Sequence, residues 1–191
     1  MTAFSHIQRQ TQTHPATGFA ILHGTLAPEG CVVKLEGFNV ETFDGPARVF
    51  GSTAEALDGI QRGRVRACDI VIVRQDGEDI TAEGMDAVMH AITDACIERV
   101  TVITDARVDG AADNAIIGNV APTAAARGPI AYINDDDIIH IDIASRRIDI
   151  FADIDMRRAV KLQKPGKTTF GAGALEKYAR LVTSVTHEGM F

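Results

Sequence analysis

The stretch Ile21-Leu-His-Gly-Thr-Leu-Ala-Pro-Glu-Gly-Cys-Val-Val-Lys-Leu-Glu-Gly37 decides the fold of this chain. Two short apolar runs flank a turn rich in Gly and Pro, the residues that tight turns use most. We therefore expect strands over residues 19–22 and 31–35, with a turn over 27–30 between them. A second glycine–proline sequence, Asp44-Gly-Pro-Ala-Arg-Val-Phe50, follows closely.

Helical and strand patterns alternate in the middle of the chain. Ser52-Thr-Ala-Glu55 is a capping box and predicts a helix that ends near residue 62. Apolar side chains at helical spacing predict a second helix over 84–98. Two β-branched runs, 69–74 and 100–104, enclose this helix and predict buried strands.

We expect the two buried strands to pair in parallel through a helical crossover. In such units a ligand site lies beyond the carboxyl ends of the strands. Those ends lead into the loops 75–83 and 105–119, where we look for the chemistry of this chain.

The last third of the chain has more strand character. Residues 130–133 and 138–143 predict strands around the turn Asn134-Asp-Asp-Asp137, and 147–151 predict a returning strand. Alternation places Ile139 and Ile141 on one face of the second strand, with His140 and Asp142 opposite. A final helix is expected over 173–184. Mixed strands with outer helices predict a compact α/β domain with a β-barrel-like sheet.

Composition limits the classes of function. Nineteen basic against twenty-six acidic residues give a net charge of −7, which argues against nucleic acid and anionic membranes as partners. No apolar run approaches the ~20 residues of a membrane-spanning helix. The first residues lack the pattern of a signal peptide, so we expect a cytoplasmic protein. Residues 1–16 read as a polar arm, and 17–191 as a single domain.

Metal-binding motifs are absent from the sequence. Cys31, Cys68 and Cys96 are widely spaced in apolar surroundings and are expected to be reduced, mostly buried thiols. An iron–sulfur or zinc site needs closely spaced cysteine pairs. No histidine pair has zinc spacing, and we expect structural or surface roles for His23, His90 and His140. We interpret the basic group as a solvated segment, with a docking surface for an acidic partner as the alternative; its members are Arg157, Arg158, Lys161, Lys164 and Lys167.

Many segments, in the same order, resemble the C-terminal domain of the dihydroxy-acid/6-phosphogluconate dehydratase family. The resemblance covers residues 18–191 and includes the opening stretch. Its other segments are Asp69-Ile-Val-Ile-Val-Arg74, Val102-Ile-Thr-Asp-Ala-Arg-Val-Asp-Gly110, Ile117-Gly-Asn-Val-Ala-Pro-Thr-Ala124, Gly128-Pro-Ile-Ala131, Asp137-Ile-Ile-His-Ile-Asp-Ile143 and Tyr178-Ala-Arg-Leu-Val-Thr-Ser184.

The resemblance implies a swivelling β/β/α barrel-like domain that closes over an active site. The family is a group of hydro-lyases that dehydrate 2,3-dihydroxy or sugar acids to 2-keto acids. An iron–sulfur cluster acts as Lewis acid, a magnesium ion holds the carboxylate side, and a base removes the C2 proton. The cluster cysteines and most metal ligands belong to the family's N-terminal domain, which this sequence lacks.

Both family residues expected from this domain are replaced. The serine base corresponds to Asp109, and a metal-binding glutamate after Gly84-Met85 corresponds to Ala87. By the same resemblance, Gly110, Ala111 and Asn119 are candidates for substrate binding. Asp109 could serve as a base, but a solvated acidic loop is the simpler interpretation.

A hard-cation site among the acidic residues of the two loops is a further alternative. Its candidate ligands are Asp76, Glu78, Asp79, Glu83, Asp105 and Asp113. No spacing among them matches a defined calcium or magnesium loop, and we expect no metal site.

Two functions remain open. The favoured one is a non-catalytic homologue of the dehydratase domain that acts through self-association, as a homo-oligomer, or by binding a partner or a small molecule. The other is a subunit of a split dehydratase, completed by a cluster-bearing partner chain that brings the iron–sulfur cluster and magnesium. We expect no cofactor to be bound by this chain alone. A piece of a longer enzyme is a third interpretation.

Overall fold

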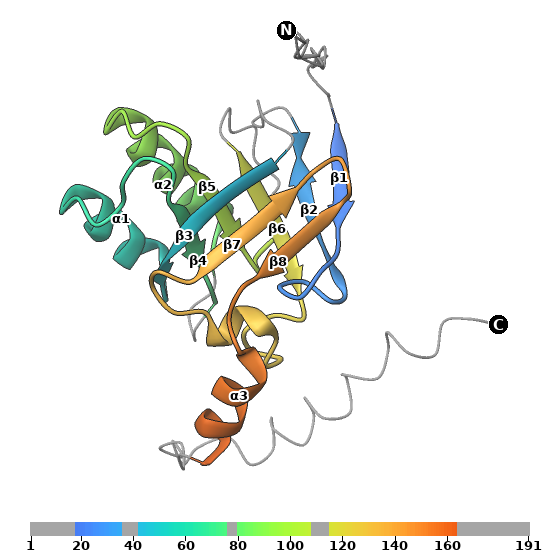
Figure 1. Ribbon diagram of the computed structural model, residues 1–191. Helices are drawn as coiled ribbons and strands as arrows, with labels where there is room; N and C mark the ends of the chain where they lie inside the picture. Colours follow the sequence, from blue (N-terminus) through green and yellow to red (C-terminus); the bar gives the residue numbers. More distant parts are fainter. Residues whose placement is uncertain (1–17, 36–41, 76–79, 108–114, 164–191) are drawn as a thin grey trace, which may run out of the picture. The chain divides into compact units, whose positions relative to one another are not determined.

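The computed structural model describes residues 18–35, 42–75, 80–107 and 115–163, whose strands form one eight-stranded sheet (Figure 1). The strand order is β1-β2-β6-β5-β4-β3-β7-β8. In chain order the strands are β1 (Phe19–Leu22), β2 (Gly30–Lys34), β3 (Thr42–Phe50), β4 (Ile70–Val73), β5 (Thr101–Thr104), β6 (Ile116–Ala121), β7 (Ile138–Asp142) and β8 (Arg147–Ile150). The central strands β3, β4, β5 and β6 are parallel, and β2 and β7 pair antiparallel on either side.

The two edges of the sheet meet at His23, so the sheet is a nearly closed barrel. The His23 backbone N–H donates to the carbonyl of Arg146 (3.0 Å), and the N–H of Ile148 donates to the His23 carbonyl (3.1 Å). The Thr25 hydroxyl then accepts the N–H of Ile150 at 2.9 Å. These bonds cover an edge that would otherwise be open. The barrel-like α/β fold expected from the sequence is confirmed.

The central strands separate two apolar cores. On β4, Ile70 and Ile72 face the barrel interior, whereas Val71 and Val73 face the helices. The same alternation places Ile103 of β5 inside the barrel and Val102 outside it. Each strand is therefore buried on both faces, as parallel strands with covered faces require. Burial of one such side chain stabilises the fold by roughly 1.5–3 kcal/mol.

Two helices cover the outer face of the parallel strands (Figure 1). In α1 (Thr53–Gln61) the Ser52 hydroxyl accepts the N–H of Glu55 (3.2 Å) as expected, and the Glu55 carboxylate reaches back to the N–H of Gly51 (2.8 Å), one residue before the N-cap. Helix α2 (Ala82–Asp94) begins after Thr81, whose hydroxyl accepts the N–H of Gly84 at 3.1 Å. The parallel pairing of β4 and β5 around α2 confirms the predicted strand–helix–strand unit.

The structure corrects three predictions of secondary structure. Residues predicted as a strand over 130–133 form a 3-10 helix, η2 (Pro129–Tyr132), which begins with a proline that has no N–H for a strand ladder. Strand β6 lies in a segment that was predicted as a loop. The sequence pattern missed it because Gly118 and Asn119 interrupt its apolar run. Strand β3 was not predicted, since Gly45 and Pro46 are depleted in strands.

A third helix, α3 (Ile154–Gln163), was also not predicted. Asp153 begins it by accepting the N–H of Met156 at 2.8 Å. Arg157 was assigned to a solvated basic segment, and for this residue the prediction is wrong. Its guanidinium forms a two-pronged ion pair with Asp137, one prong at 2.8 Å, and donates to the Tyr132 carbonyl at 3.1 Å.

The chain divides into two compact units, Met1–Arg157 and Arg158–Phe191. The second lies mostly outside the described residues, as do the polar arm over 1–16 and the helix expected over 173–184. A single domain over 17–191 therefore stays a prediction. None of the helices in the described ranges is long and apolar enough to cross a membrane.

The three cysteines are unpaired, and they differ in exposure. Cys31 lies in the barrel core, where its thiol contacts the Leu22 carbonyl at 3.7 Å. Burial raises the pKa of the Cys31 thiol to about 12, against a smaller lowering by that carbonyl. Cys68 is half-buried and Cys96 is exposed. The expectation of mostly buried thiols is wrong for Cys96.

Replacement of Gly24 tests the closure of the barrel. A Cβ at this position would lie 1.9 Å from the Ile148 carbonyl oxygen, so the segment would have to leave β8. We expect Gly24→Ala to lower the free energy of unfolding by about 2–3 kcal/mol in urea denaturation. Thr25→Ser, which keeps the hydroxyl and adds no atom, should cost less than about 1 kcal/mol. Equal stability of Gly24→Ala and the wild type would contradict this closure.

Thiol alkylation tests the burial of Cys31. With a pKa of about 12, only about one Cys31 thiol in 10,000 is ionised at pH 8. Iodoacetamide should therefore modify Cys96 in the folded protein and leave Cys31 unmodified, as measured by peptide mass spectrometry. All three cysteines should react in denaturant. Modification of Cys31 as fast as Cys96 in the native protein would show that the barrel core is not closed.

Candidate functional site

The carboxyl ends of the four parallel strands form one edge of the sheet. There the chain leaves β3 after Phe50, β4 after Val73, β5 after Thr104 and β6 after Ala121. Since both faces of the central strands are buried, a ligand can reach this part of the sheet only at its ends. We call this edge, with the residues that follow each strand, the carboxyl-end edge.

Asp105 connects three of the loops at this edge. It follows β5 directly and is only 6% exposed. One carboxylate oxygen accepts the N–H of Gln75, after β4, at 2.9 Å. The other accepts the N–H of Ala124, after β6, at 2.7 Å. Both oxygens of this candidate cation ligand are thus already bonded to backbone amides.

Arg74 supports the same edge from β4. Its guanidinium donates to the carbonyls of Ile130 (3.5 Å), Ala131 (3.2 Å) and Ile133 (3.1 Å), around η2. These bonds satisfy carbonyl groups that a short 3-10 helix leaves unpaired. Arg74 therefore holds η2 against the end of β4.

Asn119 is the one sequence-predicted substrate-binding residue that the structure describes. It lies in β6 with a positive φ of 53° and an exposed side chain. Its N–H donates to the carbonyl of Ala106 at 2.9 Å, so it lies beside the start of the loop after β5. Asp109, Gly110 and Ala111 lie outside the described residues.

The pair Gly84-Met85 has a packing role. A Cβ at Gly84 would lie 3.0 Å from the Thr53 hydroxyl, so this glycine lets the starts of α2 and α1 approach. Met85 is buried in the outer core. Ala87 lies two residues later on α2 with its side chain exposed. Its methyl group stands where the resemblance places a metal-binding carboxylate, and it cannot ligate a metal.

The described residues do not fit the family's cofactors. Cys31 is a buried thiol with a raised pKa, whereas a cluster ligand must be a thiolate. Asp105 is bonded to two amides, and Glu83 is exposed in the first turn of α2. In the part of the chain that the structure describes, no three His, Cys, Asp or Glu side chains could hold a metal ion. Asp76, Glu78, Asp79 and Asp113 lie outside it.

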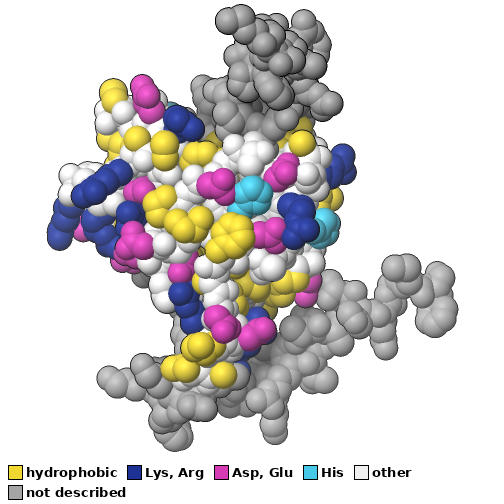
Figure 2. Space-filling model, in the orientation of Figure 1, with side chains coloured by type: hydrophobic (Ala, Val, Ile, Leu, Met, Phe, Trp, Pro, Cys, Tyr) yellow, Lys and Arg dark blue, Asp and Glu magenta, His cyan; other side chains and the backbone are white. Residues whose placement is uncertain are grey.

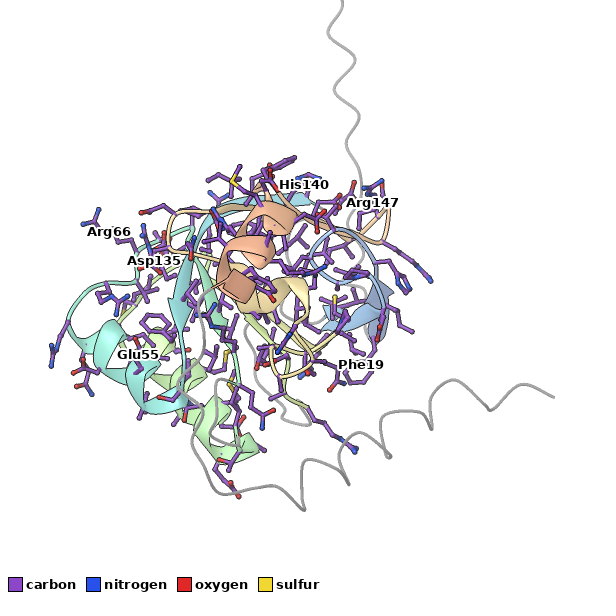
Figure 3. All side chains as sticks on the ribbon, turned by 90° about the horizontal axis from the view of Figure 1, so that it is seen from below. Phe19, Glu55, Arg66, Asp135, His140 and Arg147 are labelled. Atoms are coloured by element: carbon purple, nitrogen blue, oxygen red, sulfur yellow. The ribbon has the colours of Figure 1, made fainter. Side chains whose placement is uncertain are left out.

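The opposite, amino end of the strands carries a second set of ion pairs. Asp69, 3% exposed, accepts the N–H of Arg66 (2.8 Å) and pairs with Arg48 (3.0 Å). Arg48 also binds Asp136 at 2.6 Å. Asp135 binds the N–H of Val49 at 2.7 Å, and Figure 3 shows Asp135 and Arg66 on the same side of the domain. These bonds hold the turn before β7 against β3.

The outer face of β3, β7 and β8 is mixed in character (Figure 2). His140 contacts Asp44 at 2.6 Å between a ring nitrogen and a carboxylate oxygen. His140 and Arg147 project from the same face (Figure 3), where Phe151 is 68% exposed. Sequence periodicity predicted that His140 and Asp142 share a polar face, and this is confirmed. It did not predict the partner Asp44, which is 96 residues away.

Comparison with known proteins identifies the family of this chain. Residues 7–189 match the model of the dihydroxy-acid/6-phosphogluconate dehydratase C-terminal family. The dihydroxy-acid dehydratase of Saccharolobus islandicus is 38% identical over 188 residues, 95% of this chain and 34% of the relative. Dihydroxy-acid dehydratase 2 of Corynebacterium efficiens is 43% identical over 179 residues, 91% of this chain and 31% of the relative.

A third relative, the dihydroxy-acid dehydratase of Leifsonia xyli, is 40% identical over 178 residues, 90% of this chain and 31% of the relative. The chain therefore spans about a third of the length of the curated relatives that it matches. The matched family model covers nearly all of it. This chain belongs to the dihydroxy-acid/6-phosphogluconate dehydratase C-terminal family.

Proposed function

We propose that this domain acts by binding, through self-association or through a partner or small molecule, and does not dehydrate a substrate with its own side chains. The observation that carries the proposal is Ala87. The helix that presents it is well formed, and Gly84 and Met85 before it keep their packing roles. The helix is thus well packed, and by the resemblance Ala87, which has no donor atom, takes the place of the family's metal-binding glutamate.

The cofactor chemistry supports the same proposal. Buried Cys31 has a protonated thiol, and the carboxylate of Asp105 holds two loops together. We propose that the chain alone binds no iron–sulfur cluster and no magnesium ion. Reduced cysteines in all three described positions agree with a cytoplasmic location, which stays a proposal.

The carboxyl-end edge is the proposed surface for a small acid. It contains the ends of four parallel strands, where ligands of open α/β sheets bind. Asp109, with Gly110 and Ala111, belongs to the loop that leaves this edge after β5. In this proposal Asp109 is not a catalytic base, and the candidate substrate-binding residues are Gly110, Ala111 and Asn119.

Self-association is the proposed binding mode for the outer sheet face. Ile138 and Phe151 are neighbours there, since the Phe151 N–H donates to the Ile138 carbonyl at 2.9 Å. Their side chains are 42% and 68% exposed. Exposed apolar side chains that lie together commonly mark a contact surface.

A split dehydratase is the second candidate. It is supported by relatives that are about three times as long as this chain and carry the name dihydroxy-acid dehydratase. In that case a partner chain would supply the cluster, magnesium and most of their ligands. Asp109 would then be the candidate base for a 2,3-dihydroxy acid.

Anaerobic purification of the tagged chain from its host distinguishes the binding domain from the split dehydratase. We expect the chain to appear alone, as an oligomer or with a protein that has no cluster, and to contain no iron by elemental analysis. The preparation should form no 2-keto acid from a 2,3-dihydroxy acid. The intact Corynebacterium efficiens relative, purified in the same way, is the positive control. Recovery of a cluster-bearing partner, together with 2-keto acid formation that Asp109→Asn abolishes, would overturn the binding proposal.

A further inference from the structure

We infer that Asp105 is the positioning residue of the carboxyl-end edge: its buried carboxylate fixes Gln75, which follows β4, and Ala124, which follows β6, relative to the end of β5. This inference rests on the proposed function in one respect: the proposed ligand surface lies at the same edge of the sheet. Its evidence is the set of bonds around one carboxylate, which needs no ligand.

The carboxylate geometry suits two fixed donors. Each oxygen of Asp105 receives one backbone N–H, from Gln75 at 2.9 Å and from Ala124 at 2.7 Å. The donors lie 30 and 19 residues away in sequence, in two different loops. Hydrogen bonds from N–H groups to an ionised acceptor are about twice as strong as those between neutral groups. A single side chain therefore links the described residues that directly follow β4, β5 and β6.

The backbone next to Asp105 is held as well. The Thr104 hydroxyl, fully buried, accepts the N–H of Ala106 at 3.1 Å. The Ala106 carbonyl accepts the N–H of Asn119 at 2.9 Å. Asp105 and Ala106 are thus held on both sides, to β4 through Gln75 and to β6 through Asn119 and Ala124.

A direct role in catalysis or metal binding fits Asp105 less well. The side chain is almost completely buried, and both oxygens already face donors. A cation at this carboxylate would have to compete with two N–H groups that would lose their acceptor. Asp105 therefore acts through the loops that it holds, and any ligand contact belongs to those loops.

Asp105→Asn is the sharpest test, since it keeps the shape and one acceptor oxygen but turns an NH2 donor toward a backbone N–H. Asp69→Asn is the matched control, because Asp69 is equally buried and accepts a backbone N–H at the opposite end of β4. Native-state hydrogen exchange measured by NMR reports each amide separately.

We expect the exchange of the Gln75 or Ala124 amide to rise at least about 10-fold in Asp105→Asn, with the Ile72 amide of β4 unchanged. The amide resonances of Ala106 and Asn119 should shift in the same variant. In Asp69→Asn, the Arg66 amide should lose protection and these resonances should stay in place. Wild-type exchange at both Gln75 and Ala124 in Asp105→Asn, or an equal effect of Asp69→Asn on them, would overturn the inference.

A measurement on the wild-type chain covers the case in which Asp105→Asn does not fold. Couplings through the hydrogen bonds, between the amide nitrogens of Gln75 and Ala124 and the carboxylate carbon of Asp105, should be detected by NMR. Absence of both couplings would contradict the inference. Neither measurement involves a ligand, so a failed binding or activity assay would count against the proposed function alone.

Discussion

The burial of both faces of the central strands is the constraint on which the rest of this structure depends. Ile70 and Ile72 fill the barrel, and Val71 and Val73 meet the helices, so β4 has no face left for polar chemistry. Polar groups next to β4 are therefore confined to the two ends of the strand. Asp69 and Asp105 occupy opposite ends of the sheet, and each accepts backbone N–H groups there. The location of the candidate site follows from the packing of the two cores.

Sequence patterns predicted elements whose signal is local. The capping box at Ser52 and the β-branched runs of β4 and β5 were confirmed, because each depends on neighbouring residues. The patterns failed where contacts between residues distant in sequence determine the local structure. Arg74 bonds the carbonyls around η2, and Arg157 in α3 pairs with Asp137. From the sequence alone, Asp105 was a candidate cation ligand. Its two amide partners lie 19 and 30 residues away, so no local sequence pattern predicts them.

Retention of the scaffold and retention of the site are separate questions in this family member. Gly84 favours the close approach of α2 to Thr53, and Met85 fills the outer core, so both have a packing role whether or not a metal binds nearby. Ala87 is exposed, so packing requires neither an alanine nor a carboxylate side chain at this position. Membership of the family therefore establishes the fold, whereas an activity has to be argued from the residues of the site.

A chimera tests the central claim, that the scaffold is kept and the site replaced. This chain would take the place of the matching C-terminal region of Corynebacterium efficiens dihydroxy-acid dehydratase 2, its 43% identical relative. The account predicts a folded chimera with the iron content of the parent that forms 2-keto acid at least about 100-fold more slowly. Ala87→Glu combined with Asp109→Ser should recover activity. An unaltered chimera as fast as the parent would contradict the account.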